Sequence, residues 1–347
     1  MAVDDSSGLA DMGFLIRGMQ VTRMLEVVAT FGVADRIGEA PQPVAELAAA
    51  VCADPAMLAR LCRALAACGV FEVDAEGRVS HNERSRWLRT DARPTLYHAV
   101  RYWGMPSTWD VWSRLEAVVR SGEPAFEAMF GKPYFAYLKD HPDEAARFDS
   151  FMQNSPDDRH AAVAEAYDFS GADVVVDIGG GNGALLAAIL KAYPSVRGVL
   201  FDHPEVIAPA LSTFPVLSGR CSLEGGDFFE TVPGGGDVYT LSQIIHDWSD
   251  ERCLAILGKC RRAMHQGARL LVIERVLDPI PDSAKAANYL ADMHMMVLFG
   301  EARERTAEEF AALFAKAGFE PPRIRPTRSS FFVIETRPAL ASAADSD

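Results

Sequence analysis

The sequence predicts an α/β protein in which a doubly wound parallel sheet follows a smaller, mostly helical domain. Three observations support this fold class. Short apolar segments alternate with helix-like segments from Val174 onward, which is typical of a parallel sheet. A glycine-rich turn at 179–183 directly follows the first of these segments, as in Rossmann-like sheets. The first third of the chain has helical periodicity and a brief strand pair near its end.

The N-terminal third has the element order of a winged helix-turn-helix. Apolar residues at helical spacing predict two early helices, 16–28 and 44–48. A third helix begins at Asp54 and Pro55, an N-cap residue followed by proline at the first helical position. Gly69 ends that helix, and the segments 70–73 and 78–80 then form the two-stranded wing.

Winged helices often bind DNA, so DNA binding has to be weighed. The expected recognition helix, 55–65, carries only two arginines and lacks the amide side chains that read a major groove. Acidic residues outnumber basic ones across residues 1–100. We therefore interpret residues 1–100 as a packing or dimerisation domain. Residues 101–347 are expected to form the sheet domain, with 101–168 as a helical connection that contributes to its ligand pocket.

The second part of the chain supports the parallel sheet element by element. Its predicted strands are 174–178, 198–201, 221–224, 238–241 and 270–273. Helices are expected at 160–167, 184–191, 206–210, 250–264 and 306–317. The segments 323–326 and 331–334 are expected to form a closing hairpin. Ligands bind such sheets at the carboxyl ends of the strands, so we expect the functional residues there.

Composition and charge exclude several functional classes. The chain has 347 residues and a net charge of −14, which argues against broad binding to nucleic acid or to anionic membranes. No apolar run is long enough to span a membrane, and the acidic, polar residues 1–6 are unlike a signal peptide. The six cysteines form no C-x-x-C pair and the histidines are scattered. These features predict a reduced, cytoplasmic protein without a metal site.

The glycine-rich turn narrows the choice of cofactor. Gly179, Gly181 and Gly183 are spaced more tightly than the glycines of a dinucleotide fingerprint, and Asp177 precedes them by two positions. No Gly-Lys-Ser/Thr follows, so a P-loop is excluded. The cofactor therefore need not carry a pyrophosphate.

Two later carboxylates complete the cofactor prediction. Asp202 lies 25 residues after Asp177, which suits a carboxylate that binds a ribose diol. Asp227 stands beside Phe228, a pairing of acceptor and aromatic face that suits an adenine. Adenosine without a diphosphate indicates S-adenosylmethionine as the cofactor and S-adenosylhomocysteine as the product.

The sequence is similar to the small-molecule O-methyltransferases of the plant caffeic acid type and of bacterial polyketide and antibiotic pathways. The resemblance covers almost the whole chain and rests on the segments 176–183, 202–204, 226–229, 245–251 and 303–310. The order Ile245-His246-Asp247-Trp248 is its most specific part. The resemblance implies a homodimer in which the N-terminal domain helps to close the substrate pocket of the partner.

His246 is the expected general base. A phenol, with a pKa of about 10, is mostly neutral at pH 7, so a base must remove its proton during the attack. A histidine base needs a partner, and Glu274 at the end of an apolar strand is the best candidate. The resemblance implies that Glu274 and Glu304 flank the base, with Glu301 as a competing neighbour. Asp247 is expected to hold the cofactor or the loop.

The acceptor pocket is expected to be apolar and aromatic with a few polar groups. The resemblance implies the lining residues Trp103, Phe148, Met152, Asn288, Asp292, Met293 and Met296. The segment 292–296 is rich in methionine, whose thioethers adapt to flat ligands, although core packing explains it equally well. His294, within this segment, is expected to pack rather than to contact substrate.

Two positions depart from the family. Ser242 is an expected cofactor contact at a position where plant members commonly have a lysine. Pro156 stands where a serine often meets the amino-acid end of the cofactor, and Ser155 is the candidate to replace it.

Three hypotheses follow from the sequence. The first is a cytoplasmic, homodimeric O-methyltransferase that acts on a phenolic or polyketide-like acceptor. The second is an N-methyltransferase, or another S-adenosylmethionine enzyme of secondary metabolism, for which the base matters less. The third is a ligand-sensing winged-helix regulator, which the acidic N-terminal region disfavours.

Overall fold

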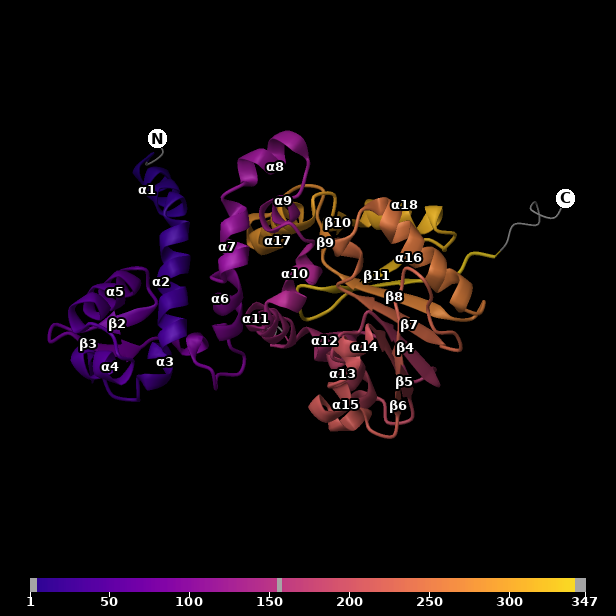
Figure 1. The fold of residues 1–347 in the computed structure, drawn as a ribbon, viewed down its shortest axis with the longest axis horizontal. Coiled ribbons are helices and arrows are strands. Elements are labelled where there is room, and N and C mark those ends of the chain that lie inside the picture. Colours follow the sequence, from indigo (N-terminus) through magenta and orange to yellow (C-terminus); the bar gives the residue numbers. More distant parts are fainter. Residues whose placement is uncertain (1–4, 155–157, 341–347) are drawn as a thin grey trace. The chain divides into compact units, whose positions relative to one another are not determined.

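The computed structural model of the chain describes residues 5–154 and 158–340 (Figure 1). It divides the chain into two compact units. The first comprises Met1–Ser113 with Phe135–Pro156, and the second comprises Arg114–Tyr134 with Asp157–Asp347. Residues 101–113 and 135–154, which the sequence assigned to the sheet domain, therefore belong to the first unit.

The first unit contains the predicted winged-helix elements. Its early helices are α1 (Asp5–Ile16), α2 (Gly18–Phe31), α3 (Val33–Arg36), α4 (Val44–Ala50) and α5 (Pro55–Ala67). Asp54 caps α5 by accepting a hydrogen bond from the Met57 amide (2.9 Å). The wing strands β2 (Phe71–Val73) and β3 (Arg78–His81) are antiparallel. The short strand β1 (Gln42–Pro43), which the sequence did not predict, pairs with β3.

The helix predicted over 16–28 is interrupted, because α1 ends at Ile16 and α2 begins at Gly18. The core of this unit gathers apolar side chains of α2, α4 and α5, among them Val28, Leu47 and Leu65. Later elements are η1 (Ser85–Leu88), α6 (Tyr97–Trp103), α7 (Pro106–Trp112), α10 (Tyr134–Asp140) and α11 (Pro142–Gln153).

The second unit is built on a seven-stranded sheet with the order β11-β12-β8-β7-β4-β5-β6. Its parallel strands are β4 (Val174–Ile178), β5 (Arg197–Asp202), β6 (Cys221–Gly225), β7 (Val238–Ser242) and β8 (Arg269–Glu274). The predicted closing hairpin consists of β11 (Arg323–Pro326) and β12 (Phe332–Thr336), and β12 joins β8 antiparallel. The predicted sheet is thus confirmed, with an antiparallel hairpin at one edge.

Helices cover both faces of this sheet, which makes it doubly wound (Figure 1). On one face, α12 (Arg159–Ala166) and α13 (Ala184–Ala192) share a core with Val175 of β4. On the other face, α16 (Asp250–Ala263) and α18 (Ala307–Lys316) share a core with Val176. Successive strand residues point to opposite faces, so both sides of β4 are buried and its run of valines is explained.

The remaining elements complete the second unit. They are α8 (Leu115–Ser121), α9 (Ala125–Phe130), α14 (Pro204–Ile207), α15 (Ala210–Thr213), η2 (Pro215–Leu217), η3 (Ile245–Asp247), β9 (Val276–Leu277), η4 (Ser283–Lys285), α17 (Ala286–Phe299) and β10 (Arg305–Thr306). The single helix expected near 206–210 is therefore two short helices, α14 and α15. Among the described residues, the structure contains no helix that combines the length and the apolar character needed to cross a membrane.

The carboxyl ends of the parallel strands bring the predicted site residues to one edge of the sheet. The glycine turn follows β4, and β5, β7 and β8 end at Asp202, Ser242 and Glu274. Beyond β8, the short strands β9 and β10 pair in parallel and set Arg305 opposite Val276. This pairing ties the segment after Glu274 to the segment that contains Glu304.

Candidate active site

The glycine turn after β4 leaves one side of its backbone open. Gly179, Gly181 and Gly183 have φ angles of +63°, +58° and +86°, a left-handed conformation that favours glycine. A Cβ atom on Gly179 would lie 2.5 Å from Ile244 Cδ1, whereas one on Gly181 would meet nothing within 4 Å. The turn is therefore packed at its start and faces open space at its centre, as a cradle for a ligand requires.

Asp177 supports this turn from the inside. Its side chain is completely buried, and Thr240 Oγ1 donates a hydrogen bond to Asp177 Oδ1 (2.6 Å). Burial raises the pKa of Asp177 to about 7. A Cβ atom on Gly180 would lie 2.6 Å from Asp177 Oδ2. The sequence assigned Asp177 to cofactor contact, but the structure instead buries it beneath the turn.

The other predicted cofactor residues lie around the open side. Asp202 Oδ2 accepts a hydrogen bond from the Gly181 amide (2.9 Å), and Asp202 Oδ1 accepts one from the amide of its neighbour His203 (2.7 Å). A carboxylate accepts about four hydrogen bonds, so Asp202 retains capacity for hydroxyl groups. Phe228 Cε1 lies 3.4 Å from the point that a Cβ atom on Gly179 would occupy, which places its ring beside the turn.

Asp227 and Ser242 are two further residues predicted to contact the cofactor. Asp227 Oδ1 accepts a hydrogen bond from the Phe229 amide (2.8 Å), which fixes the turn that presents Phe228. Ser242 is half-buried at the end of β7. The positions Ser155 and Pro156 lie outside the described residues.

His246 is surrounded by three carboxylates. It lies in the single turn η3 and is 8% exposed. Its Nδ1 atom is 3.1 Å from Glu274 Oε2 and 3.3 Å from Glu304 Oε1, and its Nε2 atom is 3.3 Å from Asp247 Oδ1. At these distances charge couples the imidazole to the two glutamates.

Each glutamate also has a second contact. Glu274 is fully buried, and its Oε1 atom accepts hydrogen bonds from the amides of Ile245 (2.9 Å) and His246 (3.3 Å). Glu304 is 3% exposed, and its Oε1 atom lies 3.3 Å from Arg275 Nη1. Glu301 is exposed, so the geometry places Glu304, and not Glu301, beside the imidazole.

The electrostatics of this cluster shift the pKa values of its members and favour a proton on the imidazole. Burial lowers the pKa of His246, but Glu274, Asp247 and Glu304 together raise it well above its usual 6.5. Burial raises the pKa of Asp247 to about 7. Burial also raises the pKa of Glu304, yet His246 and Arg275 more than offset this and the net shift is downward. Because the groups lie so close together, their protons leave as a coupled set.

Several residues of the site carried no clear signal in the sequence. Arg159 is 5% exposed at the start of α12, and its Nη1 atom donates to Gln243 Oε1 (3.3 Å). Gln243 directly follows β7 and has a φ angle of +56°, which is uncommon for a residue other than glycine. Thr240 and Arg275 support Asp177 and Glu304. In the sequence, Gln243 and Thr240 stand shortly before the 245–251 motif and Arg275 directly follows Glu274, and only this proximity could have drawn attention to them.

The predicted acceptor residues fall in both units. Trp103, Phe148 and Met152 belong to the first unit. The second unit contributes, from α17, the residues Asn288, Asp292, Met293 and Met296. His294 of the same helix is 3% exposed, and burial lowers its pKa to about 3, as for a neutral packed imidazole.

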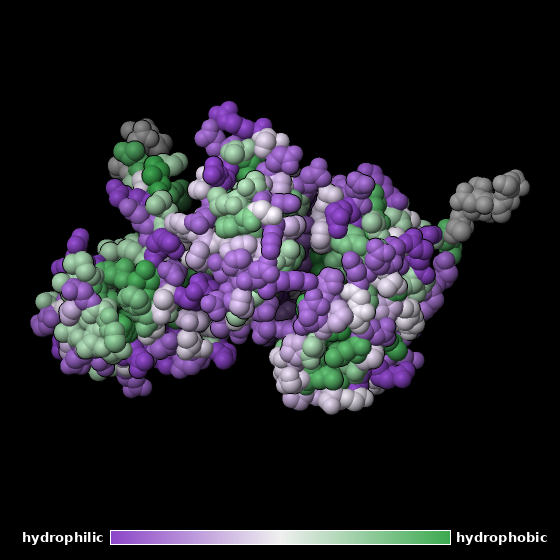
Figure 2. Space-filling model, in the orientation of Figure 1, coloured by the Kyte–Doolittle hydropathy of each residue, from purple (hydrophilic) through white to green (hydrophobic). Residues whose placement is uncertain are grey.

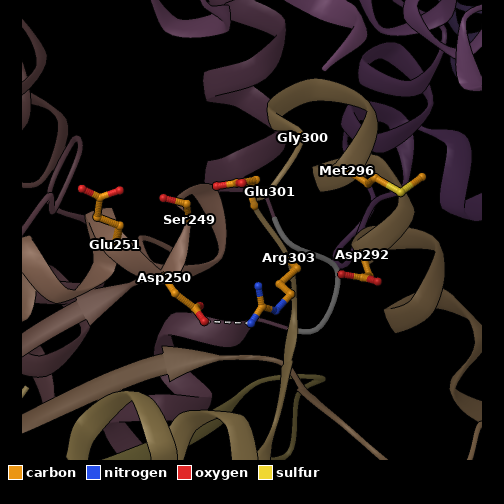
Figure 3. Close-up of a pocket in the computed structure, with 9 residues that line it drawn as sticks. Ser249, Asp250, Glu251, Asp292, Met296, Gly300, Glu301 and Arg303 are labelled. Carbon is orange, nitrogen blue, oxygen red and sulfur yellow. Dashed lines mark hydrogen bonds and ion pairs between the residues drawn. The ribbon is translucent and has the colours of Figure 1, made fainter. Parts of the chain in front are cut away.

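Asp292 and Met296 line a cavity of about 520 Å³ in the second unit. Figure 3 shows Arg303 pointing toward Asp250, and Arg303 Nη2 lies 3.0 Å from Asp250 Oδ2. The complete lining is Ser249, Asp250, Glu251, Asp292, Met296, Gly300, Glu301, Ala302 and Arg303. This lining is mostly charged, and therefore differs from the apolar, aromatic acceptor pocket, which stays a prediction.

His246, Glu274 and Glu304 could together offer one ligand atom each to a metal ion, because these atoms lie within 4.8 Å of one another. Imidazole and carboxylate ligands suit several divalent metals. The guanidinium of Arg275 and a proton on His246 would both oppose the binding of a cation. The absence of a metal from the reaction stays a prediction for chelation to test.

Comparison with known proteins assigns both the N-terminal part and the sheet-containing part of the chain to protein families. Residues 112–320 match the O-methyltransferase domain family, and residues 14–91 match the O-methyltransferase dimerisation domain. A phenazine O-methyltransferase of Lysobacter antibioticus is 40% identical over 93% of this chain and 94% of its own. An O-demethylpuromycin O-methyltransferase of Streptomyces alboniger is 40% identical over 93% of this chain and 88% of its own.

Solved structures extend the similarity to the fold. The crystal structure of a mitomycin 7-O-methyltransferase superimposes with a TM-score of 0.88 at 34% identity, over 96% of this chain and 99% of that one. An O-methyltransferase from neocarzinostatin biosynthesis was solved with S-adenosylmethionine and 2-hydroxy-5-methyl naphthoic acid. It superimposes with a TM-score of 0.78 at 31% identity, over 92% of this chain and 96% of that one.

The doubly wound sheet and the similarity to methyltransferases solved with S-adenosylmethionine identify the class of the protein as an S-adenosylmethionine-dependent methyltransferase. The chain belongs to the O-methyltransferase family, with its catalytic and dimerisation domains both present. It is an S-adenosylmethionine-dependent O-methyltransferase related to enzymes of bacterial secondary metabolism.

Proposed function

We propose that the enzyme methylates a hydroxyl group of an aromatic or polyketide-like small molecule, with His246 as the general base. One observation carries this proposal. The imidazole lies at the carboxyl edge of the sheet, 3.1 Å and 3.3 Å from the two glutamates, on the turn that follows β7. An imidazole held between carboxylates can accept a proton and stabilise the resulting imidazolium.

The residues around the glycine turn fit the cofactor. The open space at Gly181 admits a ligand against the backbone, Asp202 can accept from the ribose hydroxyls, and the ring of Phe228 suits the adenine. Arg159, buried near the end of β7, is a cation suited to the carboxylate of the amino-acid end. We therefore add Arg159 to the candidate cofactor residues.

The bound sulfonium supplies an activated methyl group, which the acceptor oxygen attacks in line as the sulfur–carbon bond breaks and a neutral thioether leaves. The residues of the chain orient the acceptor and receive its proton. Glu274 and Glu304 face Nδ1 of His246, which leaves Nε2, next to Asp247, as the atom for the acceptor proton. Base assistance of this kind typically contributes about 10²–10⁴-fold.

An N-methyltransferase is the alternative within the family. A phenazine-1-carboxylate N-methyltransferase of Pseudomonas aeruginosa is 35% identical over 95% of this chain and 96% of its own. A neutral amine already presents a lone pair, so its methylation depends little on a base. The buried carboxylates around His246 favour the hydroxyl acceptor, because they stabilise an imidazolium that only the hydroxyl reaction must form.

The enzyme is proposed to work as a homodimer. Helix α1 exposes large apolar side chains, and Figure 2 shows hydrophobic surface over this helix. They include Leu9 (76% exposed), Leu15 (71%) and Ile16 (75%). Residues 14–91 match the dimerisation domain family, so a second copy of this chain is the expected cover for this surface. Light scattering on the purified protein tests this, and a monomer at micromolar concentration would contradict it.

The decisive experiment is an acceptor screen with S-adenosylmethionine labelled in its methyl group. The acceptors are a hydroxyphenazine, 3-amino-4-hydroxybenzoate, 2,7-dihydroxy-5-methyl-1-naphthoate and, for nitrogen, phenazine-1-carboxylate. With the best hydroxyl acceptor, His246→Ala is expected to lower kcat about 10²–10⁴-fold while cofactor binding survives. His265→Ala, an exposed histidine paired with Asp237, is the matched control. Unchanged turnover in His246→Ala would refute the base assignment.

The same assay tests the metal prediction. Chelation with EDTA followed by desalting is expected to leave turnover unchanged. A loss of turnover that Zn²⁺ or Mg²⁺ restores would show that the His246, Glu274 and Glu304 atoms hold a metal instead.

A further inference from the structure

We propose that Arg305 is a positioning residue that fixes the backbone of the His246 turn. The proposal rests on the proposed function of His246 as the base. Arg305 is 1% exposed and is among the largest side chains that are fully buried in the described part of the chain. A buried guanidinium is costly unless its charge and its five N–H donors are satisfied, so its partners show what it holds in place.

Most of those partners lie in one short segment; the others are the Arg303 carbonyl, which accepts from Nη1 (3.2 Å), and Cys253 Sγ, 3.5 Å from Nη2. Arg305 Nη1 donates to the Ile245 carbonyl (2.9 Å), and Nη2 donates to the Trp248 carbonyl (3.0 Å). These two carbonyls bracket His246 and Asp247. Asp250 Oδ1, just beyond the turn, accepts from Nη2 (2.8 Å) and from Nε (3.2 Å), which compensates the charge.

The turn has little internal support of its own. It is a single 3₁₀ turn, Ile245–Asp247, and so short an element leaves most of its backbone groups without partners inside it. On the opposite side, Glu274 Oε1 accepts from the amides of Ile245 and His246. Glu274 thus binds the amides of the turn, and Arg305 binds its carbonyls.

The placement of Arg305 in the chain links it to the chemistry. Glu304 directly precedes β10, and Arg305 is the first residue of that strand. Glu304 approaches the imidazole, while Arg305 reaches the backbone that carries this imidazole. The pairing of β10 with β9 fixes both residues relative to Glu274, two residues before Val276. The strand β10 and the residue directly before it therefore set both the electrostatic partner and the position of the base.

The test compares Arg305→Lys with a matched control. Lysine keeps the charge but cannot span two carbonyls with a planar fork. Because misplacement by about 1 Å can cost about 10²-fold, we expect kcat to fall about tenfold or more, with cofactor binding within about threefold of wild type. Arg261→Lys is the control, because Arg261 also donates to two carbonyls, those of Gly318 (2.8 Å) and Ala339 (3.4 Å), but near the far end of α16. It is expected to retain kcat within about twofold.

A double-mutant cycle separates positioning from general stability. If Arg305 acts through His246, Arg305→Lys lowers the turnover of the His246→Ala enzyme less than about twofold. An equal loss in both backgrounds would overturn the proposal. If His246→Ala itself loses no turnover, the proposed function fails instead.

NMR titration of labelled histidines gives a readout that needs no acceptor. Freed from Arg305, the imidazole moves away from its carboxylates, so its pKa falls toward the usual value in Arg305→Lys. An unchanged titration of His246 in folded Arg305→Lys would refute the positioning role. Should that variant fail to fold, Asp250→Asn weakens the anchor of the guanidinium and is expected to shift the same titration in the same direction. No shift in a folded Asp250→Asn protein would then count against the proposal.

Discussion

The two turns at the carboxyl edge of the sheet both depend on buried carboxyl groups, but in opposite ways. Beneath the glycine turn, Asp177 has a neutral hydroxyl partner, Thr240, and burial raises its pKa to about 7. In the His246 turn, Glu274 and Glu304 face the imidazole, Glu304 also faces the Arg275 guanidinium, and the charge of the carboxylates raises the pKa of the imidazole instead.

This difference shows that a buried carboxyl group can either support the structure or take part in proton transfer, depending on its partners. A buried carboxyl without a cation becomes easier to protonate, and it then acts as a neutral hydrogen-bonding support. Buried carboxylates with a titratable cation hold a proton in place, and that proton is what the proposed reaction moves. The experiments below perturb one turn while the other serves as the reference.

The largest effect is expected from removing Glu274, because it holds both the backbone and the imidazole of the His246 turn. Glu274→Ala should lower kcat roughly 10³–10⁴-fold, similar to losing the orienting carboxylate of a catalytic triad. Calorimetry should show S-adenosylhomocysteine binding within about threefold of wild type, since the glycine turn is untouched. Retained turnover would mean that Glu274 is only a structural residue.

The reciprocal variant, Gly180→Ala, breaks the glycine turn. The new Cβ atom would lie 2.5 Å from Leu200 Cδ1 and 2.6 Å from Asp177 Oδ2, so the turn must shift. We expect cofactor affinity to fall about 10²-fold, while the NMR titration of His246 stays as in wild type. Normal affinity, measured by calorimetry, would show that the turn can absorb a methyl group.

Removing one charge tests the electrostatic coupling in the His246 turn. The base acts only when unprotonated, so turnover should increase with pH through a midpoint above 6.5. Glu304→Gln removes a carboxylate that raises the pKa of His246, so this midpoint should move to lower pH and the plateau of kcat should fall about tenfold. Asp237→Asn, which perturbs the exposed His265 pair, is the control. A midpoint that moves upward would contradict the coupling.

Binding of S-adenosylmethionine and of S-adenosylhomocysteine can be compared to test whether the cofactor site lies close to His246. The sulfonium of S-adenosylmethionine carries a positive charge that S-adenosylhomocysteine lacks, and a nearby positive charge lowers the pKa of an imidazole. Binding of S-adenosylmethionine near pH 7 should therefore release up to about one more proton than binding of S-adenosylhomocysteine. Calorimetry in buffers with different ionisation enthalpies measures this difference. It should disappear in His246→Ala, and equal release by the wild-type enzyme would count against the proposed proximity.

The smallest effect is expected from Asp177→Asn, which keeps the shape and the acceptor for Thr240. Folding raises the pKa of Asp177 from 3.8 to about 7, so the folded protein holds a proton that the unfolded chain releases between these values. Its contribution to stability therefore falls as the pH rises from about 4 to 7. Relative to wild type, the Tm of Asp177→Asn should rise over this window and stay constant above it. A falling difference would refute this sign.

Much of the fold and of the cofactor edge could be predicted from the sequence because its signals are local. Runs of β-branched residues, helix caps and glycine spacing describe the backbone within a few residues of themselves, and they located the turn at 179–183 and the strand ends at Asp202 and Glu274. The same signals missed the short strand β1, which has only two residues and exists through its pairing with β3.

The sequence by itself determined the order of the elements, the glycine turn and the choice of His246 as the candidate base, because each of these depends on contiguous residues. The tertiary structure decided which acidic side chains serve that histidine. It placed Glu304 rather than Glu301 at the imidazole, buried Asp177 away from the open side, and brought Arg305 to the carbonyls of Ile245 and Trp248. These outcomes depend on strand register and on burial across tens of residues, and such long-range contacts leave no periodic trace in the chain.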